Sequence, residues 1–179
     1  MPEPIVIATW SFGQTAVQAA LPLLQEGATA LDAVLAGTQA VEDDPAVNSV
    51  GFGGLPNRIG TVQLDACVMD GKTLACGAVA GVENIRHPAA LARRVMEKTP
   101  HVLLVGDGAR SFALQEGFPL ETLTTPASLA AWEQRRRSSS VALPGGAEDH
   151  DTVTVLALDR QGSLGGACST SGLAHKLPG

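Results

Sequence analysis

The sequence lacks tyrosine altogether, and aromatic residues make up only 3% of its 179 positions. Glycine and alanine are abundant instead, so the core must be built from small aliphatic side chains that pack closely. With 45% hydrophobic residues, a chain of this length can bury one core. We therefore predict a single domain over residues 1–179.

Positive charge is also scarce. Twelve Lys and Arg residues against 18 Asp and Glu give a net charge of -6, which leaves no basic face to neutralise phosphates. The one basic run, Arg135–Arg137, precedes three serines and is typical of the solvated end of a helix. No apolar run approaches the roughly 18 residues of a membrane span. We therefore expect neither a nucleic-acid nor a membrane partner.

Cysteine is rare: Cys67, Cys76 and Cys168 follow no metal-binding spacing and fit buried thiols in a reducing compartment. Cys67 and Cys76 could face each other across a hairpin, and whether they pair is left open. Residues 1–4 lead into an apolar run without a basic segment or a signal-type cleavage site. We therefore expect a cytoplasmic protein.

Apolar periodicity predicts strands and helices in an irregular order. Strands are expected at residues 4–10, 61–69, 73–79, 101–105, 152–158 and 164–169, and helices at 15–25, from a Thr29 cap toward Pro45, at 88–98, at 109–115 and from 125 toward the arginines. The second helix has a predicted apolar stripe of Leu31, Val34, Leu35, Thr38 and Val41. Without regular alternation a parallel Rossmann-type sheet is disfavoured. Two hairpins with helices grouped between them predict an α+β fold with stacked α/β/β/α layers.

A polar linker, residues 137–151, ends at His150-Asp151-Thr152, where the alternating run VTVLALD begins. A threonine freed at this junction would carry an α-amine that can act as the base for its own hydroxyl. The reference pKa of an α-amine lies near neutrality, which suits that task. From these residues alone, an Asp-Thr pair that merely begins a strand remains the alternative.

Neither a cofactor nor a metal is expected. The glycine loop over residues 51–60 lacks the Lys-Ser/Thr of a phosphate-binding loop. The polar run at residues 148–151 could supply metal ligands, but consecutive side chains diverge and no distant His/Cys cluster completes a site.

Two further positions could belong to a site. Trp10 ends the first strand and could either lie in the core or form the wall of an active site. Thr170 and its neighbouring serines end the last strand, where their hydroxyls could face Thr152 or serve turn formation.

Together the segments resemble the glycosylasparaginase family of N-terminal nucleophile hydrolases, within asparaginase type 2. The resemblance is carried, in the family's order, by PIVIATW, ALDAVLAGTQAVEDDPAVNSVGFGGLPN, VQLDACVMDG, HPAALARRVMEKTPHVLLVGDGARSFALQEGF, HDTVTVLALD and GACSTSGLAHK. GGLPN and His-Asp-Thr point to the glycosylasparaginase branch, because the isoaspartyl-peptidase and plant-type asparaginase branch typically has Gly-Thr. The resemblance implies a four-layer αββα sandwich.

The resemblance also implies chemistry. The precursor would cut itself between Asp151 and Thr152, so that residues 1–151 form the α-subunit region and residues 152–179 begin the β-subunit. Thr152 would then attack the side-chain amide of a substrate of aspartyl-glucosamine type. Thr170 matches the family's second hydroxyl, which hydrogen-bonds the nucleophile, and Trp10 matches the tryptophan that lines the substrate site. We expect an αβ heterodimer that associates with a second heterodimer. No cofactor is expected.

The chain departs from the family at Gly179. An Arg-Val-Gly-Asp segment that clamps the substrate would follow there, and further on a Thr-Gly pair that forms the oxyanion hole. Loss of one oxyanion donor costs roughly 100- to 1,000-fold in rate. We therefore expect an uncleaved, C-terminally truncated precursor with an incomplete sandwich, inactive by itself. The alternatives are an L-asparaginase or isoaspartyl peptidase of the same family, and a non-catalytic remnant.

Overall fold

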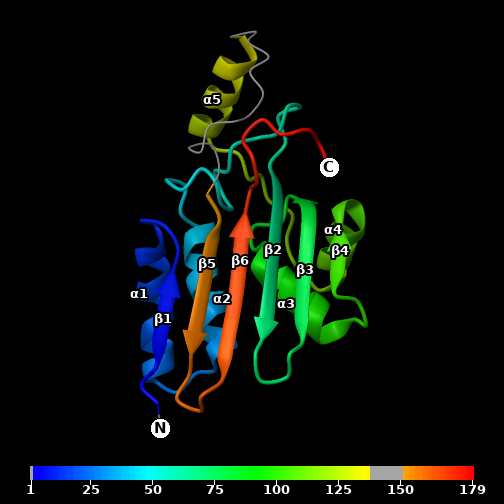
Figure 1. Ribbon diagram of the computed structural model, residues 1–179. Helices are drawn as coiled ribbons and strands as arrows, with labels where there is room; N and C mark the ends of the chain where they lie inside the picture. Colours follow the sequence, from blue (N-terminus) through cyan, green and yellow to red (C-terminus); the bar gives the residue numbers. More distant parts are fainter. Residues whose placement is uncertain (1, 138–150) are drawn as a thin grey trace.

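The computed structural model describes residues 2–137 and 151–179. These residues form one mixed α/β unit (Figure 1). Its elements, in order, are β1 (Ile5–Ala8), α1 (Gly13–Gln25), α2 (Ala30–Glu42), β2 (Gln63–Asp70), β3 (Cys76–Glu83), α3 (Pro88–Lys98), β4 (Leu103–Val105), α4 (Gly106–Gln115), α5 (Pro126–Arg137), β5 (Val153–Leu158) and β6 (Leu164–Thr170). Every predicted helix and strand is present, with ends shifted by a few residues.

The strands of the described part make one six-stranded sheet in the order β1-β5-β6-β2-β3-β4. Each neighbouring pair is antiparallel except β3 and β4, which run parallel. Both predicted hairpins, β2–β3 and β5–β6, therefore lie in the same sheet, joined where β6 pairs with β2. Helices α1, α2 and α3 pack on one face of this sheet (Figure 1). Within residues 2–137 and 151–179 there is thus one sheet layer, where stacked layers with two sheets were expected.

Helix α2 begins as predicted, because the Thr29 hydroxyl accepts a hydrogen bond from the backbone N–H of Asp32 at 3.1 Å. Its buried face is only partly the predicted one. Val34, Thr38 and Val41 are fully buried, whereas Leu31 and Leu35 are half-buried. Alanines at 30 and 33 and the glycine at 37 complete the buried face instead.

Small residues at the contacts between helices and sheet explain the scarcity of aromatics. A Cβ at Gly77 on β3 would lie 2.2 Å from the carbonyl oxygen of Ala92 on α3. A Cβ at Gly165 on β6 would lie 2.7 Å from the carbonyl carbon of Ala30 on α2. Both helices therefore lie too close to the sheet for a larger residue at either position.

The other face of the sheet carries apolar side chains that nothing in the described part covers. Along β5, Val153, Val155 and Ala157 point toward the helices and are buried, so the alternate residues point the other way. On that side Ile5, Ile7, Met69, Leu103, Val105, Leu156 and Leu164 are each 44–60% exposed. We call this side the open face. Contiguous apolar patches of this kind mark interaction surfaces.

The arginines at 135–137 are exposed at the end of α5, as predicted. None of the helices in residues 2–137 and 151–179 is both long and apolar enough to cross a membrane.

Candidate active site

Three strand ends meet at one edge of the sheet, where β1 ends, β5 begins and β6 ends (Figure 1). The last register pair of β5 and β6 joins Val153 to Ser169, so Thr152 lies opposite Thr170 one residue further on. Thr9 follows the last residue of β1, and its backbone N–H donates to the carbonyl oxygen of Thr154 at 3.1 Å. We call Thr9, Thr152 and Thr170 the threonine cluster.

Thr9 holds the backbone of Thr152. Its hydroxyl donates a 2.8 Å hydrogen bond to the carbonyl oxygen of Thr152 and accepts a 2.9 Å bond from the N–H of Thr154. Thr152 itself is exposed. The residue predicted to be the nucleophile is therefore accessible and fixed by an adjacent strand.

Thr170 lies beside the peptide bond that precedes Thr152. Its Oγ1 is 3.5 Å from the carbonyl oxygen of Asp151, a long hydrogen bond, and 3.3 Å from that of Ser49. The same oxygen accepts a 2.9 Å bond from the N–H of Gly172, which fixes its position. A hydroxyl placed there can donate to the Asp151 carbonyl, the group that an attack by Thr152 would turn into an oxyanion.

Trp10 is not a core residue: it is 58% exposed, so the core alternative is wrong. Its backbone φ is +64°, a left-handed conformation that a bulky residue rarely adopts. It directly follows Thr9, and its carbonyl accepts the N–H of Gly13 at the start of α1. Such backbone strain persists only where the surrounding structure imposes it, and it is common at functional sites.

Two charged residues next to the cluster were missed from the sequence. Asp65 on β2 pairs in register with Thr170. One Asp65 oxygen accepts the N–H of Gly81 at 2.7 Å, and the other lies 3.6 Å from Nζ of Lys176. Asp65 is part of the VQLDACVMDG segment, but no local pattern indicates that it meets a strand about a hundred residues later.

The loop between α2 and β2 also contributes through its backbone. The carbonyl oxygen of Ser49 accepts the N–H of Ser171 at 2.7 Å and lies within reach of the Thr170 hydroxyl. The irregular loop over residues 48–56 thus supports the end of β6. No pattern in the sequence indicates this contact.

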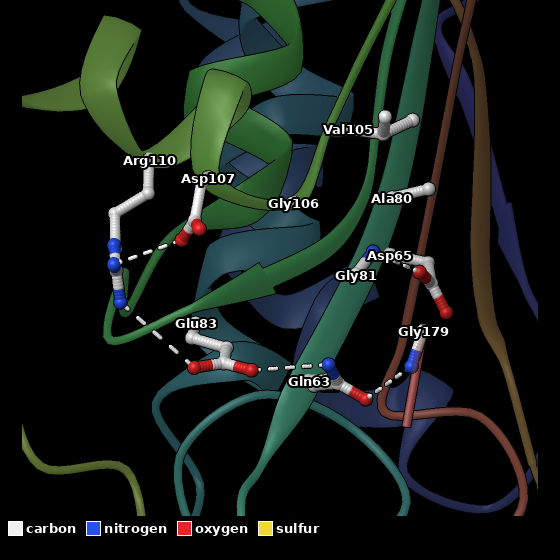
Figure 2. A pocket seen from close by; sticks show the side chains of 10 residues that line it. All are labelled: Gln63, Asp65, Ala80, Gly81, Glu83, Val105, Gly106, Asp107, Arg110 and Gly179. Atoms are coloured by element: carbon white, nitrogen blue, oxygen red, sulfur yellow. Dashed lines mark hydrogen bonds and ion pairs between the residues drawn. The ribbon is translucent and has the colours of Figure 1, made fainter. Parts of the chain in front are cut away.

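A cavity of about 400 Å³ lies at the β2–β3–β4 side of the molecule, and Asp65 is among the residues that line it (Figure 2). Its polar groups satisfy one another. Glu83 accepts a 3.0 Å bond from Gln63 and faces Arg110 at 3.9 Å, and Arg110 pairs with Asp107 at 2.8 Å. The chain of contacts links β2, β3 and α4, which indicates a structural role.

Among the residues that the structure describes, no group of three or more His, Cys, Asp or Glu side chains could hold a metal ion. Residues 138–150 lie outside the described residues. They include His150 and most of the acidic run considered as metal ligands.

The sequence matches known proteins along its whole length. The family model described as Asparaginase matches residues 4–179. An N(4)-(Beta-N-acetylglucosaminyl)-L-asparaginase of Elizabethkingia miricola is 50% identical over 99% of this chain and 52% of its own length. An isoaspartyl peptidase of Salmonella typhimurium is 41% identical over 91% of this chain and 55% of its own. A human isoaspartyl peptidase/L-asparaginase is 40% identical over 88% and 52%. The chain spans about half the length of these relatives.

Proposed function

Because the chain belongs to the asparaginase family, we propose that it cuts its own backbone between Asp151 and Thr152 and then works as an amidohydrolase with Thr152 as nucleophile. One observation carries this proposal. The peptide carbonyls before and after Thr152 each contact a side-chain hydroxyl. The Asp151 carbonyl contacts the Thr170 hydroxyl, and the Thr152 carbonyl contacts the Thr9 hydroxyl. A residue that only began a strand would not need two side-chain contacts at its flanking peptides.

The first reaction is an N-to-O acyl shift. The Thr152 hydroxyl attacks the carbonyl carbon of Asp151, the C–N bond breaks, and the amine takes the hydroxyl proton. An ester then joins Asp151 to the Thr152 oxygen, and water hydrolyses it. The Thr170 hydroxyl stabilises the oxyanion that forms on the Asp151 carbonyl, while Thr9 keeps the attacking residue in place.

The second reaction uses the freed Thr152 in the same way on a substrate. Its α-amine accepts the hydroxyl proton, and the oxygen attacks a side-chain amide to form a β-aspartyl ester. The amine portion leaves, and water releases aspartate. Asp151 no longer blocks the cluster after cleavage, so the Thr170 hydroxyl becomes free to hydrogen-bond the nucleophile. The exposed ring of Trp10 supplies an apolar wall at the same end of the sheet.

A glycosylated asparagine is the proposed substrate. Asp151-Thr152 has the form found in the glycosylasparaginase branch. The relative named N(4)-(Beta-N-acetylglucosaminyl)-L-asparaginase is 50% identical to this chain, whereas two isoaspartyl peptidases are 41% and 40% identical to it. Hydrolysis of free asparagine or β-aspartyl dipeptides is the alternative that these other relatives support.

We also propose that the open face is covered by a second sheet, which would give the four-layer αββα sandwich. The support is the apolar character of that face, together with relatives that are about twice as long as this chain. The cleaved halves would then stay together as an αβ heterodimer, and two heterodimers would associate.

The protein as its gene encodes it tests the proposal. Mass spectrometry should find a fragment that begins at Thr152. Thr152→Ala should give one uncut chain, whereas Thr152→Ser, which keeps a hydroxyl, should still cut. Cleavage of the alanine variant at the same bond would show that another protease is responsible. The processed protein is then assayed on aspartyl-glucosamine, asparagine and β-aspartyl dipeptides. Inactivity on all three would support the non-catalytic remnant.

A further inference from the structure

The chain changes direction just after the threonine cluster and runs from the end of β6 toward β2 and β3 (Figure 1). Beyond Thr170, the N–H of Lys176 donates to the carbonyl oxygen of Leu173 at 3.3 Å, which closes a tight turn. Gly172 allows this change of direction because its φ is +68°, a conformation that residues with a Cβ rarely adopt. We call residues 171–176 the return turn.

Lys176 brings its ammonium group back onto this turn and onto β2. Its Nζ lies 3.6 Å from a carboxylate oxygen of Asp65 and donates to the carbonyl oxygen of Gln63 at 3.4 Å. A Cβ at Gly172 would lie 3.0 Å from the same Nζ, so the ammonium packs directly on the return turn. The Lys176 side chain is only 17% exposed, so solvent screens its ion pair less than it screens a surface pair.

Asp65 is itself held in place. The carboxylate oxygen that does not face Lys176 accepts the N–H of Gly81 on β3 at 2.7 Å, a contact that Figure 2 shows. The backbone of Asp65 pairs in register with Thr170. The ion pair therefore ties the return turn to β2 and β3 directly beside Thr170.

The return turn also fixes the hydroxyl of Thr170. Its Oγ1 accepts the N–H of Gly172 at 2.9 Å. Because one lone pair is engaged in this way, the hydroxyl proton can point at a carbonyl, and the carbonyl oxygens of Ser49 and Asp151 lie at 3.3 and 3.5 Å. Gly172 thus sets Thr170 as a donor toward the peptide bond that the proposed reaction breaks.

We propose that Asp65 and Lys176 are positioning residues for the chemistry at Thr152. Their ion pair holds the return turn, so that the Gly172 N–H fixes the Thr170 hydroxyl. This role rests on the proposed function, because the position of Thr170 matters only if its hydroxyl assists the reaction. The pair needs no access from solvent. A second sheet over the open face would desolvate it and make the loss of one partner more costly.

Lys176→Met, made in the protein as its gene encodes it, removes the ammonium and keeps an unbranched chain. We expect self-cleavage to slow by roughly two- to twelvefold, the effect of one hydrogen bond. Lys176→Arg, which keeps the charge, should restore most of the rate. Lys72→Met is the matched control, because Lys72 is exposed in the β2–β3 turn at the other end of the sheet. Equal rates for Lys176→Met and Lys72→Met overturn the proposal.

A double-mutant cycle separates positioning from a general loss of stability. In a Thr170→Val background the hydroxyl that the pair positions is gone, so Lys176→Met should slow cleavage further by less than about twofold. A slowdown of the same size in both backgrounds would mean that Lys176 acts on the fold as a whole, and it would overturn the proposal. Asp65→Asn keeps an acceptor for the Gly81 N–H and should match Lys176→Met. The two changes together should be no slower than either alone, since each removes the same ion pair.

A second measurement does not depend on cleavage. Hydrogen exchange followed by mass spectrometry reports on the peptide that covers the return turn, in the uncut Thr152→Ala protein. Adding Lys176→Met should raise the exchange rate of this peptide, while adding Lys72→Met should not. Unchanged exchange overturns the proposal.

The two measurements distinguish the possible failures. If the natural protein cuts itself and Lys176→Met cuts equally fast, the positioning role fails and the proposed function stands. If the natural protein does not cut itself, the proposed function fails and takes the positioning role with it. The exchange rates then still decide whether the ion pair holds the return turn.

Discussion

The hydroxyl of Thr9 donates a 2.8 Å hydrogen bond to the carbonyl oxygen of Thr152. The two residues lie far apart in the sequence, and β1 and β5 bring them together at the edge where both strands have an end. The same hydroxyl also accepts a hydrogen bond from the N–H of Thr154, so it bridges the first residues of the chain after the proposed cleavage point.

Thr9→Val keeps the side-chain shape and removes both hydrogen bonds. We expect self-cleavage to slow by roughly two- to twelvefold for each of the two bonds lost, since one such bond is worth about 0.5–1.5 kcal/mol. The rate at which the Thr152-starting fragment appears, followed by mass spectrometry, measures this. Thr73→Val is the control, because Thr73 bonds Asp70 in the β2–β3 turn at the other end of the sheet. Equal rates for the two variants would contradict a role for Thr9.

Thr170→Val should also slow self-cleavage, while Thr152→Ala should abolish it. In the proposed reaction, Thr170 contributes a hydrogen bond to the Asp151 carbonyl, whereas Thr152 forms the covalent bond. Removal of one oxyanion donor costs roughly 100- to 1,000-fold in well-aligned sites, and the 3.5 Å contact should give a smaller loss. The measurement is a time course of precursor conversion. Complete loss of cleavage in a folded Thr170→Val protein would show that the two hydroxyls do not divide the work in this way.

Trp10 allows a matched pair of substitutions. Trp10→Gly and Trp10→Ala both remove the exposed ring, but only glycine adopts a φ of +64° without strain. The glycine variant should be more stable than the alanine variant by about 1 kcal/mol, or roughly 2–4 °C in Tm. Both should raise KM for the substrate. Equal stability would argue against backbone strain at Trp10.

The open face can be tested by placing a charge on it. Leu156→Asp should destabilise the protein strongly if a second sheet covers that face, since a buried unpaired charge is costly. Leu120→Asp is the control: Leu120 is 54% exposed, against 45% for Leu156, and lies in the loop between α4 and α5. Thermal unfolding measures both. If Leu156→Asp unfolds at the same temperature as the control, the face is not covered.

His87 gives a prediction on pH. Its Nδ1 lies 3.4 Å from the buried carboxylate of Glu42, and this hydrogen bond raises the pKa of His87 in spite of burial and of Arg86 nearby. Asp43 adds to the same effect. A raised folded-state pKa means that the stabilisation is full below the ordinary pKa of histidine, near 6.5, and is lost as pH rises through the raised value.

The Tm of the natural protein should therefore exceed that of His87→Gln most clearly at pH 5.5–6, and the difference should shrink toward pH 9. His101→Gln, a change at an exposed histidine, serves as control. A difference that grows with pH would show that the Glu42–His87 pair does not act through charge.

Local patterns predicted the elements well because their causes are local. Thr29 caps α2 through a residue three positions on, and Pro88 begins α3 with Leu91 and Val95 buried, as their spacing indicates. The predicted stripe of α2 was partly wrong because the close approach of the helix to Gly165 favours alanines over leucines. No local pattern carries that information.

The sequence by itself determined the helices, the two hairpins and the family, and it predicted Asp151, Thr152 and Thr170 as site residues, because each has a contiguous motif or a short-range period. The tertiary structure decided what these residues meet. The β1–β5 pairing sets Thr9 against Thr152, and the β6–β2 pairing sets Asp65 against Thr170 and Cys168 against Cys67. Register between distant strands depends on which faces bury apolar surface against α1, α2 and α3, a property of the assembled sheet that no single segment contains.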